Sequence, residues 1–305
     1  MEINKRDYQI SLCIPTNGVS EWVFPVLDSI YNQGVSEELF EVIVTDNGKN
    51  MIFREEMLQY AENKKNMIYR VTDAPLFLNE IEAYKSAGGK FIKFINHRTI
   101  LLAGALKQLI SFAEENEAGK PIIYFSNGVL GLSPQIKYCE TFSDFVENLS
   151  YWSSWSTGMG IWKSDFEKLP AGTEFNELFP HTTILFSERN REKYIIDDRV
   201  FLEEQRVGKI AKGRYDLFHA FAVEYPAIIC DLYRSGDIRK TTFSHVLQEN
   251  LKLIAFFYHG YVMKGKETSY DLSGFENAMD IFYSRETVLR EAEKLIAGKN
   301  HNESD

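Results

Sequence analysis

The chain has 305 residues, of which 44% are apolar and 26% are charged. That size and composition are typical of a globular protein with one large domain, or one domain and an appendage. Its 44 acidic residues outnumber its 34 lysines and arginines, and the formal net charge is −10. A general nucleic-acid-binding protein needs a basic face, so we expect no nucleic-acid partner.

Cysteine usage and the first residues indicate a reducing compartment. The three cysteines are widely separated and match neither a disulfide framework nor a Cys-x-x-Cys metal site. Residues 1–7 lack the apolar core of a signal peptide. No segment approaches the roughly 18 uninterrupted apolar residues of a membrane span. We therefore expect a cytoplasmic protein.

Strand and helix signals alternate along the first part of the chain. Short apolar runs predict strands at residues 9–15, 40–45, 67–71, 91–95 and 121–126. Apolar residues at helical spacing predict helices at residues 21–31, 52–62 and 76–87, and a further helix that Thr99 would cap. Such alternation is typical of an α/β fold with a mainly parallel sheet flanked by helices.

The C-terminal part of the chain is predicted to be helical. From about residue 215, apolar side chains recur at helical spacing in two stripes, at 246–261 and 275–295. We therefore divide the chain into an α/β domain at 1–214 and a helical region at 215–305. The stripes fit packing onto the main domain or onto a second subunit. The sequence leaves the oligomeric state open and is compatible with a homodimer.

Polar clusters follow three of the predicted strands. They are Pro15-Thr16-Asn17, Asp46-Asn47 and Asn96-His97-Arg98. Because the carboxyl ends of parallel strands meet at one edge of a sheet, and ligands bind there, we expect the three clusters to converge.

The order of these motifs resembles a known enzyme family. The first strand ends in Pro15-Thr16, although Asn17 and Gly18 replace the Tyr-Asn that usually follows, and the second ends in Asp46. Over about the first 190 residues the chain is similar to the inverting family 2 glycosyltransferases of the GT-A fold, in particular the abequosyltransferase-like group of bacterial polysaccharide enzymes. The resemblance implies a GT-A (Rossmann-like) fold and a nucleotide-sugar donor, and the apolar stripes beyond residue 215 add a C-terminal helical extension.

The resemblance also implies which residues bind the donor. In the family, the aspartate at the position of Asp46 accepts hydrogen bonds from the nucleotide base. The remaining strand-end residues and Asn79, which precedes Ala83 and Gly89 as in the family's third motif, would complete the donor site. The expected donor-binding residues are Pro15, Thr16, Asn17, Asp46, Asn47, Asn79, Asn96, His97 and Arg98.

The family often carries Asp-x-Asp where this chain has Asn96-His97-Arg98. Arg98 could take the place of a cation through bidentate contacts to the leaving diphosphate. His97 could hydrogen-bond a phosphate oxygen or the ribose. Asn96 could reach the ribose or the donor sugar. Without a carboxylate this set is a poor site for a hard cation, so we expect no cofactor, and a divalent metal (Mg²⁺ or Mn²⁺) stays the alternative. Alternatively, Arg98 opens the next helix toward solvent and His97 fills a polar position.

An inverting transferase needs a base that takes the proton from the acceptor hydroxyl. The family places Glu-Asp at the start of a helix, and here a helix is predicted at 177–188, where His181 stands in place of the aspartate. An imidazole titrates near neutrality and can serve. Glu177, one turn earlier, is the reserve candidate. Alternatively, His181 only bonds nearby backbone at the helix start.

An aromatic and small-residue segment resembles the family's region beside the donor sugar and the acceptor. Its residues are Trp152, Trp155, Thr157 and Gly158. Aromatic faces stack on pyranose rings, and small residues allow close backbone approach. Core packing is the competing interpretation.

Three functions follow from the sequence. The leading hypothesis is a metal-independent hexosyltransferase that inverts the anomeric carbon and extends a surface glycan of capsule, O-antigen or glycoprotein. A lipid-linked glycan acceptor would bring this cytoplasmic enzyme to the inner face of the membrane. The alternative is a catalytically inactive relative that serves as a binding or scaffold subunit. A sugar-phosphate nucleotidyltransferase ranks third, because residues 15–20 contain no Arg or Lys to hold a triphosphate.

Overall fold

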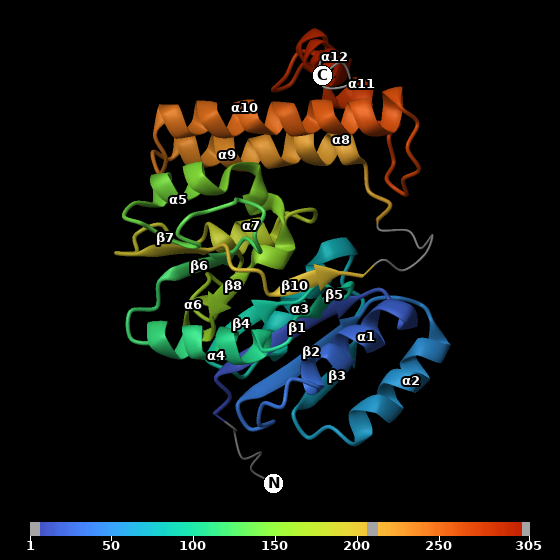
Figure 1. Ribbon diagram of the computed structural model, residues 1–305, viewed down its shortest axis with the longest axis vertical. Helices are drawn as coiled ribbons and strands as arrows, with labels where there is room; N and C mark the ends of the chain where they lie inside the picture. The colour runs from blue at the N-terminus through green and yellow to red at the C-terminus, as the bar shows by residue number, and fades with distance from the viewer. Residues whose placement is uncertain (1–6, 206–212, 301–305) are drawn as a thin grey trace. The chain divides into compact units, whose positions relative to one another are not determined.

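The computed structural model describes residues 7–205 and 213–300, with side chains to residue 295 (Figure 1). The chain forms two compact units, one of Met1–Thr141 with Trp155–Val207 and one of Phe142–Ser154 with Gly208–Asp305. The second unit therefore includes a short segment from the middle of the chain that the division at 214/215 assigns to the first domain.

The first unit is built on a five-stranded sheet in the order β3-β2-β1-β4-β8. The strands are β1 (Ile10–Thr16), β2 (Phe40–Asp46), β3 (Met67–Val71), β4 (Phe91–Phe94) and β8 (Gly160–Trp162). All neighbouring strands are parallel except β4 and β8. The prediction of a mainly parallel α/β sheet is confirmed.

Helices cover this sheet. They are α1 (Ser20–Tyr31), α2 (Met51–Glu62), α3 (Asn79–Ser86), which follows the short 3₁₀ turn η1 (Leu76–Leu78), α4 (Ala105–Asn116), α6 (Lys163–Phe166) and α7 (Pro180–Leu185). The apolar stripe of α1 is buried against β1 and β2 in one continuous core, which the apolar face of α4 extends. Burial of about 25 cal/mol per Å² of apolar surface holds these helices on the sheet.

Two smaller sheets complete the first unit. One pairs β5 (Thr99–Leu101) with β10 (Leu202–Glu204), and the other has the order β6 (Ile122–Phe125), β9 (Tyr194–Asp197) and β7 (Ile136–Cys139). The prediction that Thr99 caps a helix is wrong, because Thr99 begins β5 and α4 starts only at Ala105. The helix predicted at 177–188 is reduced to α7, because the Asn176 side chain accepts hydrogen bonds from the N–H groups of residues 178 and 179 just before it.

The second unit is helical. Its elements are α5 (Phe142–Leu149), the 3₁₀ turn η2 (Ser150–Ser154), α8 (Leu217–His219), the π-helix η4 (Ala220–Glu224), α9 (Tyr225–Arg234), α10 (Lys240–Phe257), the π-helix η5 (Tyr258–Met263), α11 (Phe275–Ala278) and α12 (Arg285–Asn300). It contains the C-terminal helical extension that the apolar stripes beyond residue 215 predict. Within the described ranges, no helix combines the length and apolarity that crossing a membrane would need.

Candidate functional site

The carboxyl ends of three strands meet at Thr16, the last residue of β1. Its hydroxyl lies 2.8 Å from Nδ1 of His97, which follows β4. Its carbonyl oxygen accepts hydrogen bonds from the backbone N–H of Asn47 at 3.1 Å and from Nδ2 of Asn79 at 3.2 Å. The sheet register also pairs Thr16 with Asp46. The polar clusters that the sequence places at separate strand ends are therefore brought together.

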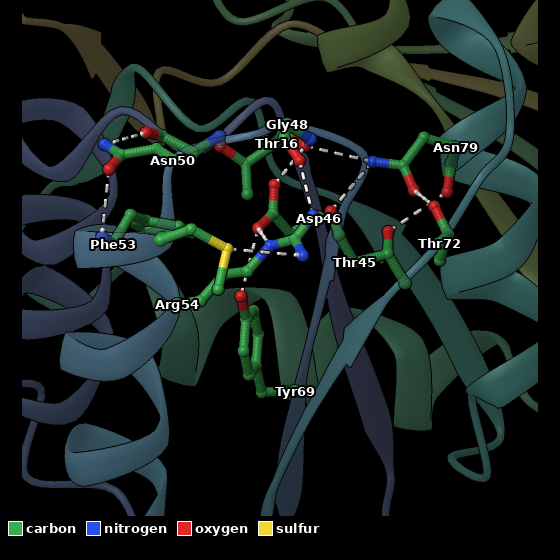
Figure 2. A network of polar contacts seen from close by, with 12 residues as sticks. Thr16, Thr45, Asp46, Gly48, Asn50, Phe53, Arg54, Tyr69, Thr72 and Asn79 are labelled. Atoms are coloured by element: carbon green, nitrogen blue, oxygen red, sulfur yellow. Dashed lines mark hydrogen bonds and ion pairs between the residues drawn. The ribbon is translucent and has the colours of Figure 1, made fainter.

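Asp46 is fully buried at the end of β2, and both of its carboxylate oxygens have partners (Figure 2). Oδ1 accepts a hydrogen bond from the N–H of Gly48 at 2.7 Å, and Oδ2 accepts one from the Tyr69 hydroxyl at 3.0 Å. Nε of Arg54 lies 3.6 Å from Oδ2. Burial, and next the Asp46 carboxylate, raise the pKa of Tyr69, so its hydroxyl remains a donor at neutral pH.

The same network joins the turn after β1 to the turn after β2. Arg54 donates from Nη2 to the carbonyl oxygen of Gly48 at 2.6 Å, and Asn50 donates from Nδ2 to that of Gly18 at 3.0 Å. A Cβ at Gly48 would lie 2.0 Å from the carbonyl oxygen of Asn17, so only glycine fits this close approach. Asn17 itself is exposed, and Pro15 is partly buried. The turns after β1 and β2 are thus held in fixed positions against each other.

We expect Asp46→Ala to destabilise the first unit by about 3 kcal/mol, because two donors and the partly buried Arg54 guanidinium would lose their acceptor. Urea denaturation would measure the change. Tyr69→Phe is the control, since it removes one hydrogen bond and should cost only about 1 kcal/mol. Equal, small losses for both variants would show that the carboxylate does not hold this network.

Asn79 anchors the start of α3 to the strand ends. Its Nδ2 donates to the carbonyl oxygens of Thr16 and Thr45, and its Oδ1 accepts from the Thr72 hydroxyl at 2.7 Å. Asn47 is similarly engaged, because its side chain donates to the carbonyl oxygens of residues 74 and 76. These two amides shape the edge of the sheet.

Residues 96–98 form a tight turn after β4. Oδ1 of Asn96 accepts a hydrogen bond from the N–H of Arg98 at 3.0 Å. Burial, and next the neighbouring guanidinium, lower the pKa of His97 to about 3, so its imidazole is neutral at physiological pH. The ring contacts the indole of Trp22 edge-on, with centroids 5.0 Å apart.

The Arg98 side chain carries donors that have no acceptor. Its guanidinium lies over the Trp22 indole, 5.4 Å from the ring centroid, and Nη1 is 3.9 Å from Oε1 of Glu204. Nε and Nη1 are buried and have no hydrogen-bond partner among the described residues. Leaving a buried charged donor unsatisfied is costly, and an anion would remove that cost. The arrangement fits a phosphate group.

The same turn does not fit a divalent cation. Asn96 has its side-chain oxygen bound to the Arg98 N–H, His97 has Nδ1 against Thr16, and Arg98 is itself positive. A hard cation prefers several oxygen ligands, above all carboxylates. Among the described residues, no group of three or more His, Cys, Asp or Glu side chains is placed to hold a metal ion.

His181 lies beside a second buried titratable group, Glu80. His181 is in the first turn of α7 and Glu80 in the first turn of α3, with exposed fractions of 5% and 2%. Nδ1 of His181 is 3.6 Å from Oε2 of Glu80. Burial raises the pKa of Glu80, and His181 opposes that shift. Glu177, in contrast, is exposed and precedes α7. Sequence reasoning missed Glu80, although it directly follows Asn79.

Three of the four residues assigned to the sugar and acceptor lie in the first unit. Thr157 and Gly158 are buried, and a Cβ at Gly158 would lie 2.0 Å from the Tyr124 ring. The Tyr124 hydroxyl donates to the carbonyl oxygen of Trp155 at 3.0 Å. Trp152 belongs to the second unit, where its ring lies 5.2 Å from that of Tyr151. Packing accounts for Thr157 and Gly158, and the contact of this segment with sugar stays a prediction.

A buried lysine, which sequence reasoning also missed, fixes this segment to β4. Nζ of Lys93 donates to the carbonyl oxygens of Thr157 at 2.5 Å, Phe94 at 2.9 Å and Met159 at 3.2 Å. Burial lowers the pKa of Lys93 to about 7, an effect that Asp197 opposes. The segment therefore has a rigid connection to the strand that ends at the polar turn 96–98.

Comparisons with known proteins show which solved structures have a similar fold. No protein-family model and no curated protein matches this chain. Among solved structures it is similar to S. aureus TarS 1–349 in complex with UDP-GlcNAc, with 16% identity, 94% of this chain and 83% of that chain covered, and a TM-score of 0.58. Against the longer S. aureus TarS structure, which is also 16% identical, the coverage is 90% of this chain and 48% of that one, with a TM-score of 0.57.

A further match is the mannosyltransferase PcManGT from Pyrobaculum calidifontis in complex with GDP-Man and Mn²⁺, with 15% identity and coverage of 80% and 71%. Its TM-score of 0.48 is too low to establish a shared fold. At 16% identity, the likeness to TarS establishes the fold alone. The chain therefore shares its fold with TarS, and this is the mainly parallel α/β arrangement expected of a GT-A domain.

Proposed function

We propose that this protein is a glycosyltransferase that moves a hexose from a nucleoside diphosphate sugar to a hydroxyl of a surface glycan. The fold supports the proposal, since it is shared with a protein solved in complex with UDP-GlcNAc. The observation that most strongly supports the proposal is the surroundings of Arg98. Arg98 presents two buried, unsatisfied donors beside the edge where the ends of β1, β2 and β4 meet. Ligands of open α/β sheets bind at that edge.

In this proposal the donor lies across the strand ends. The turns at 16–18 and 46–48 face the nucleoside with their backbone groups. Because Asp46 is buried, already accepts two hydrogen bonds and pairs with Arg54, its contribution to binding is to hold these turns in place. Asn79 and Asn47 act in the same way, while His97 and Asn96 shape the turn that presents Arg98.

The reaction is a direct displacement with inversion. As the acceptor oxygen attacks the anomeric carbon, His181 takes its proton. The bond between that carbon and the diphosphate breaks, and the nucleoside diphosphate leaves with the electron pair. Arg98 stabilises the charge that builds on the leaving phosphate, the task that a cation performs in metal-dependent enzymes. The acceptor is a glycan of capsule, O-antigen or glycoprotein, free or lipid-linked.

The proposal predicts turnover that does not depend on a divalent cation. Nucleotide sugars with uridine, guanosine, cytidine and thymidine bases are incubated with the protein, and release of nucleoside diphosphate is measured with and without EDTA. We expect at least one donor to be hydrolysed or transferred at equal rates in both conditions. Loss of all turnover in EDTA, with recovery on adding Mg²⁺ or Mn²⁺, would contradict the metal-independent mechanism. Binding without turnover would instead support a scaffold subunit.

A further inference from the structure

We propose that Lys93 is a positioning residue of the transfer reaction, which fixes the segment around Trp155 to the strand that leads into the turn of Arg98. This role rests on the proposed function, and on the expected contact of that segment with the sugar or the acceptor. Lys93 itself touches neither substrate. It acts through the backbone of residues 157–159, and the sequence motifs do not point to it.

Lys93 is the charged residue of a strand that is otherwise apolar. β4 has the sequence Phe-Ile-Lys-Phe, all four side chains are buried, and Lys93 has an exposed fraction of 1%. Its neighbours in the sheet are Leu12 on β1 and Gly160 on β8, which carry no charge. An apolar residue of similar volume is often better for stability than a buried charge. The ammonium therefore needs a role that apolar packing does not give.

The ammonium of Lys93 is surrounded by backbone carbonyl oxygens. Nζ donates to those of Thr157 at 2.5 Å, Phe94 at 2.9 Å and Met159 at 3.2 Å. An ammonium has three donors, so these bonds use its full capacity. Two of the acceptors belong to the segment and the third belongs to β4. Because hydrogen bonds from a charged donor are stronger than neutral ones, Lys93 is a firm link between the two.

The segment is held by its backbone and not by the Thr157 side chain. Oγ1 of Thr157 is buried and has no hydrogen-bond partner among the described residues. The carbonyl oxygen of Trp155 accepts from the Tyr124 hydroxyl, and that of Met159 accepts from the N–H of Phe94 at 3.2 Å as well as from Lys93. The carbonyl oxygen of Thr157 lies between these points and is bound by Lys93. Loss of a donor there loosens the part of the segment that follows Trp155.

The number of hydrogen bonds that Lys93 can donate depends on its charge. Burial lowers its pKa to about 7, and Asp197 on β9 opposes the shift. Asp197 is itself bonded to Arg199, and the Phe125 ring on β6, 5.1 Å from Nζ, carries no charge. Above its pKa the neutral amine has two donors and a lone pair, so one carbonyl oxygen loses its partner. The segment is therefore held less firmly above pH 7 than below it.

The test compares sugar transfer with donor hydrolysis by the same protein. Hydrolysis needs no ordered acceptor, whereas transfer to p-nitrophenyl hexosides depends on the segment. For the wild type, we expect the ratio of transfer to hydrolysis to fall about tenfold from about pH 6 to about pH 8.5, the effect of losing one hydrogen bond to a charged group. Lys93→Met has a side chain of similar length without a donor, so its ratio should be low at both pH values.

Lys163→Met is the matched control. Lys163 is a partly buried lysine of the same unit, and its Nζ donates to the carbonyl oxygen of Tyr84 at 3.5 Å. Its ratio should follow that of the wild type. A second readout needs no acceptor. In ¹⁹F NMR spectra of the 5-fluorotryptophan-labelled protein, the Trp155 signal, assigned with Trp155→Phe, should shift with a midpoint near pH 7, and it should not do so in Lys93→Met.

The free energy of unfolding separates positioning from a loss of the fold. Because the pKa of Lys93 is lower in the folded than in the unfolded chain, the unfolded state binds more protons between about pH 7 and pH 10. The contribution of Lys93 to stability therefore rises with pH over the range in which the transfer ratio falls. Urea denaturation of the wild type and Lys93→Met at both pH values measures this contribution.

The outcomes distinguish the two proposals. If the wild-type ratio is independent of pH, or if Lys93→Met loses hydrolysis and transfer equally, Lys93 is only structural and its positioning role is overturned, while the transferase proposal stands. If no hexoside is accepted, or if Lys93→Met does not fold, the Trp155 signal of the wild type decides, and a signal that does not titrate overturns the role. A wild-type protein that turns over no donor overturns both proposals.

Discussion

Replacing His181 with alanine is expected to lower kcat by at least about a hundredfold, the usual effect of losing a general base. The affinity for the nucleotide sugar should stay unchanged, because the base acts on the acceptor and not on the donor. His181 is buried in α7, so the variant also leaves a small cavity. Product release measured in steady state gives kcat, and calorimetry gives the donor affinity.

His259→Ala is the control for this result. His259 lies in the second unit and has an exposed fraction of 6%, close to the 5% of His181. If the loss of any buried imidazole explains the effect, His181→Ala and His259→Ala should lose activity and stability to a similar extent. If His181→Ala keeps its turnover while Glu177→Ala loses it, the exposed carboxylate is the base.

Replacing Arg98 with alanine is expected to weaken the binding of a nucleoside diphosphate by about ten- to a hundredfold, the worth of one or two hydrogen bonds to a charged group. Turnover should fall with it, because the same guanidinium stabilises the leaving diphosphate. Arg98→Lys keeps the charge but not the planar fork, so its affinity should lie between those of the wild type and Arg98→Ala. Calorimetric titration with UDP and GDP in EDTA measures all three.

Arg199→Lys provides the matched control for the arginine chemistry. Like Arg98, Arg199 is partly buried in the first unit and packs on aromatic rings, here Phe112 and Phe201, but its Nε and Nη2 are both bonded to Asp197. Its substitution should leave nucleotide affinity unchanged. If Arg98→Ala binds nucleotide as tightly as the wild type, the guanidinium does not face the phosphates and a metal-dependent mechanism becomes the better explanation.

The sequence predicts four of the five strands of the central sheet, because each of the four is a local apolar run that ends in a turn, whereas β8 (Gly160–Trp162) is too short to be found in this way. The strand predicted at 67–71 has the bounds of β3, the one at 9–15 is shifted by one residue from β1, and the one at 40–45 is one residue shorter than β2. The wrong prediction that Thr99 caps a helix has a different cause. Strand β5 exists because it pairs with β10, about a hundred residues later, and no local pattern contains that partner.

The candidate site shows the same limit. Residues that follow strands are found from the sequence, because parallel strands place their ends together. The residues that contact them from other elements are not found in this way. Tyr69 and Arg54 engage Asp46 from β3 and α2, and Glu80 meets His181 across two helices. These contacts depend on the packing of distant elements. The sequence therefore indicates which residues gather at the edge, and the structure shows which of them have free bonding capacity.

The position of a bound nucleoside diphosphate tests the central claim most directly. We expect a crystal structure of the protein with UDP, grown in EDTA, to show the diphosphate within hydrogen-bond distance of Nε and Nη1 of Arg98. The nucleoside should lie over the turns at 16–18 and 46–48. A diphosphate bound away from these strand ends, or one held while the Arg98 guanidinium keeps both donors unsatisfied on Trp22, would contradict the account.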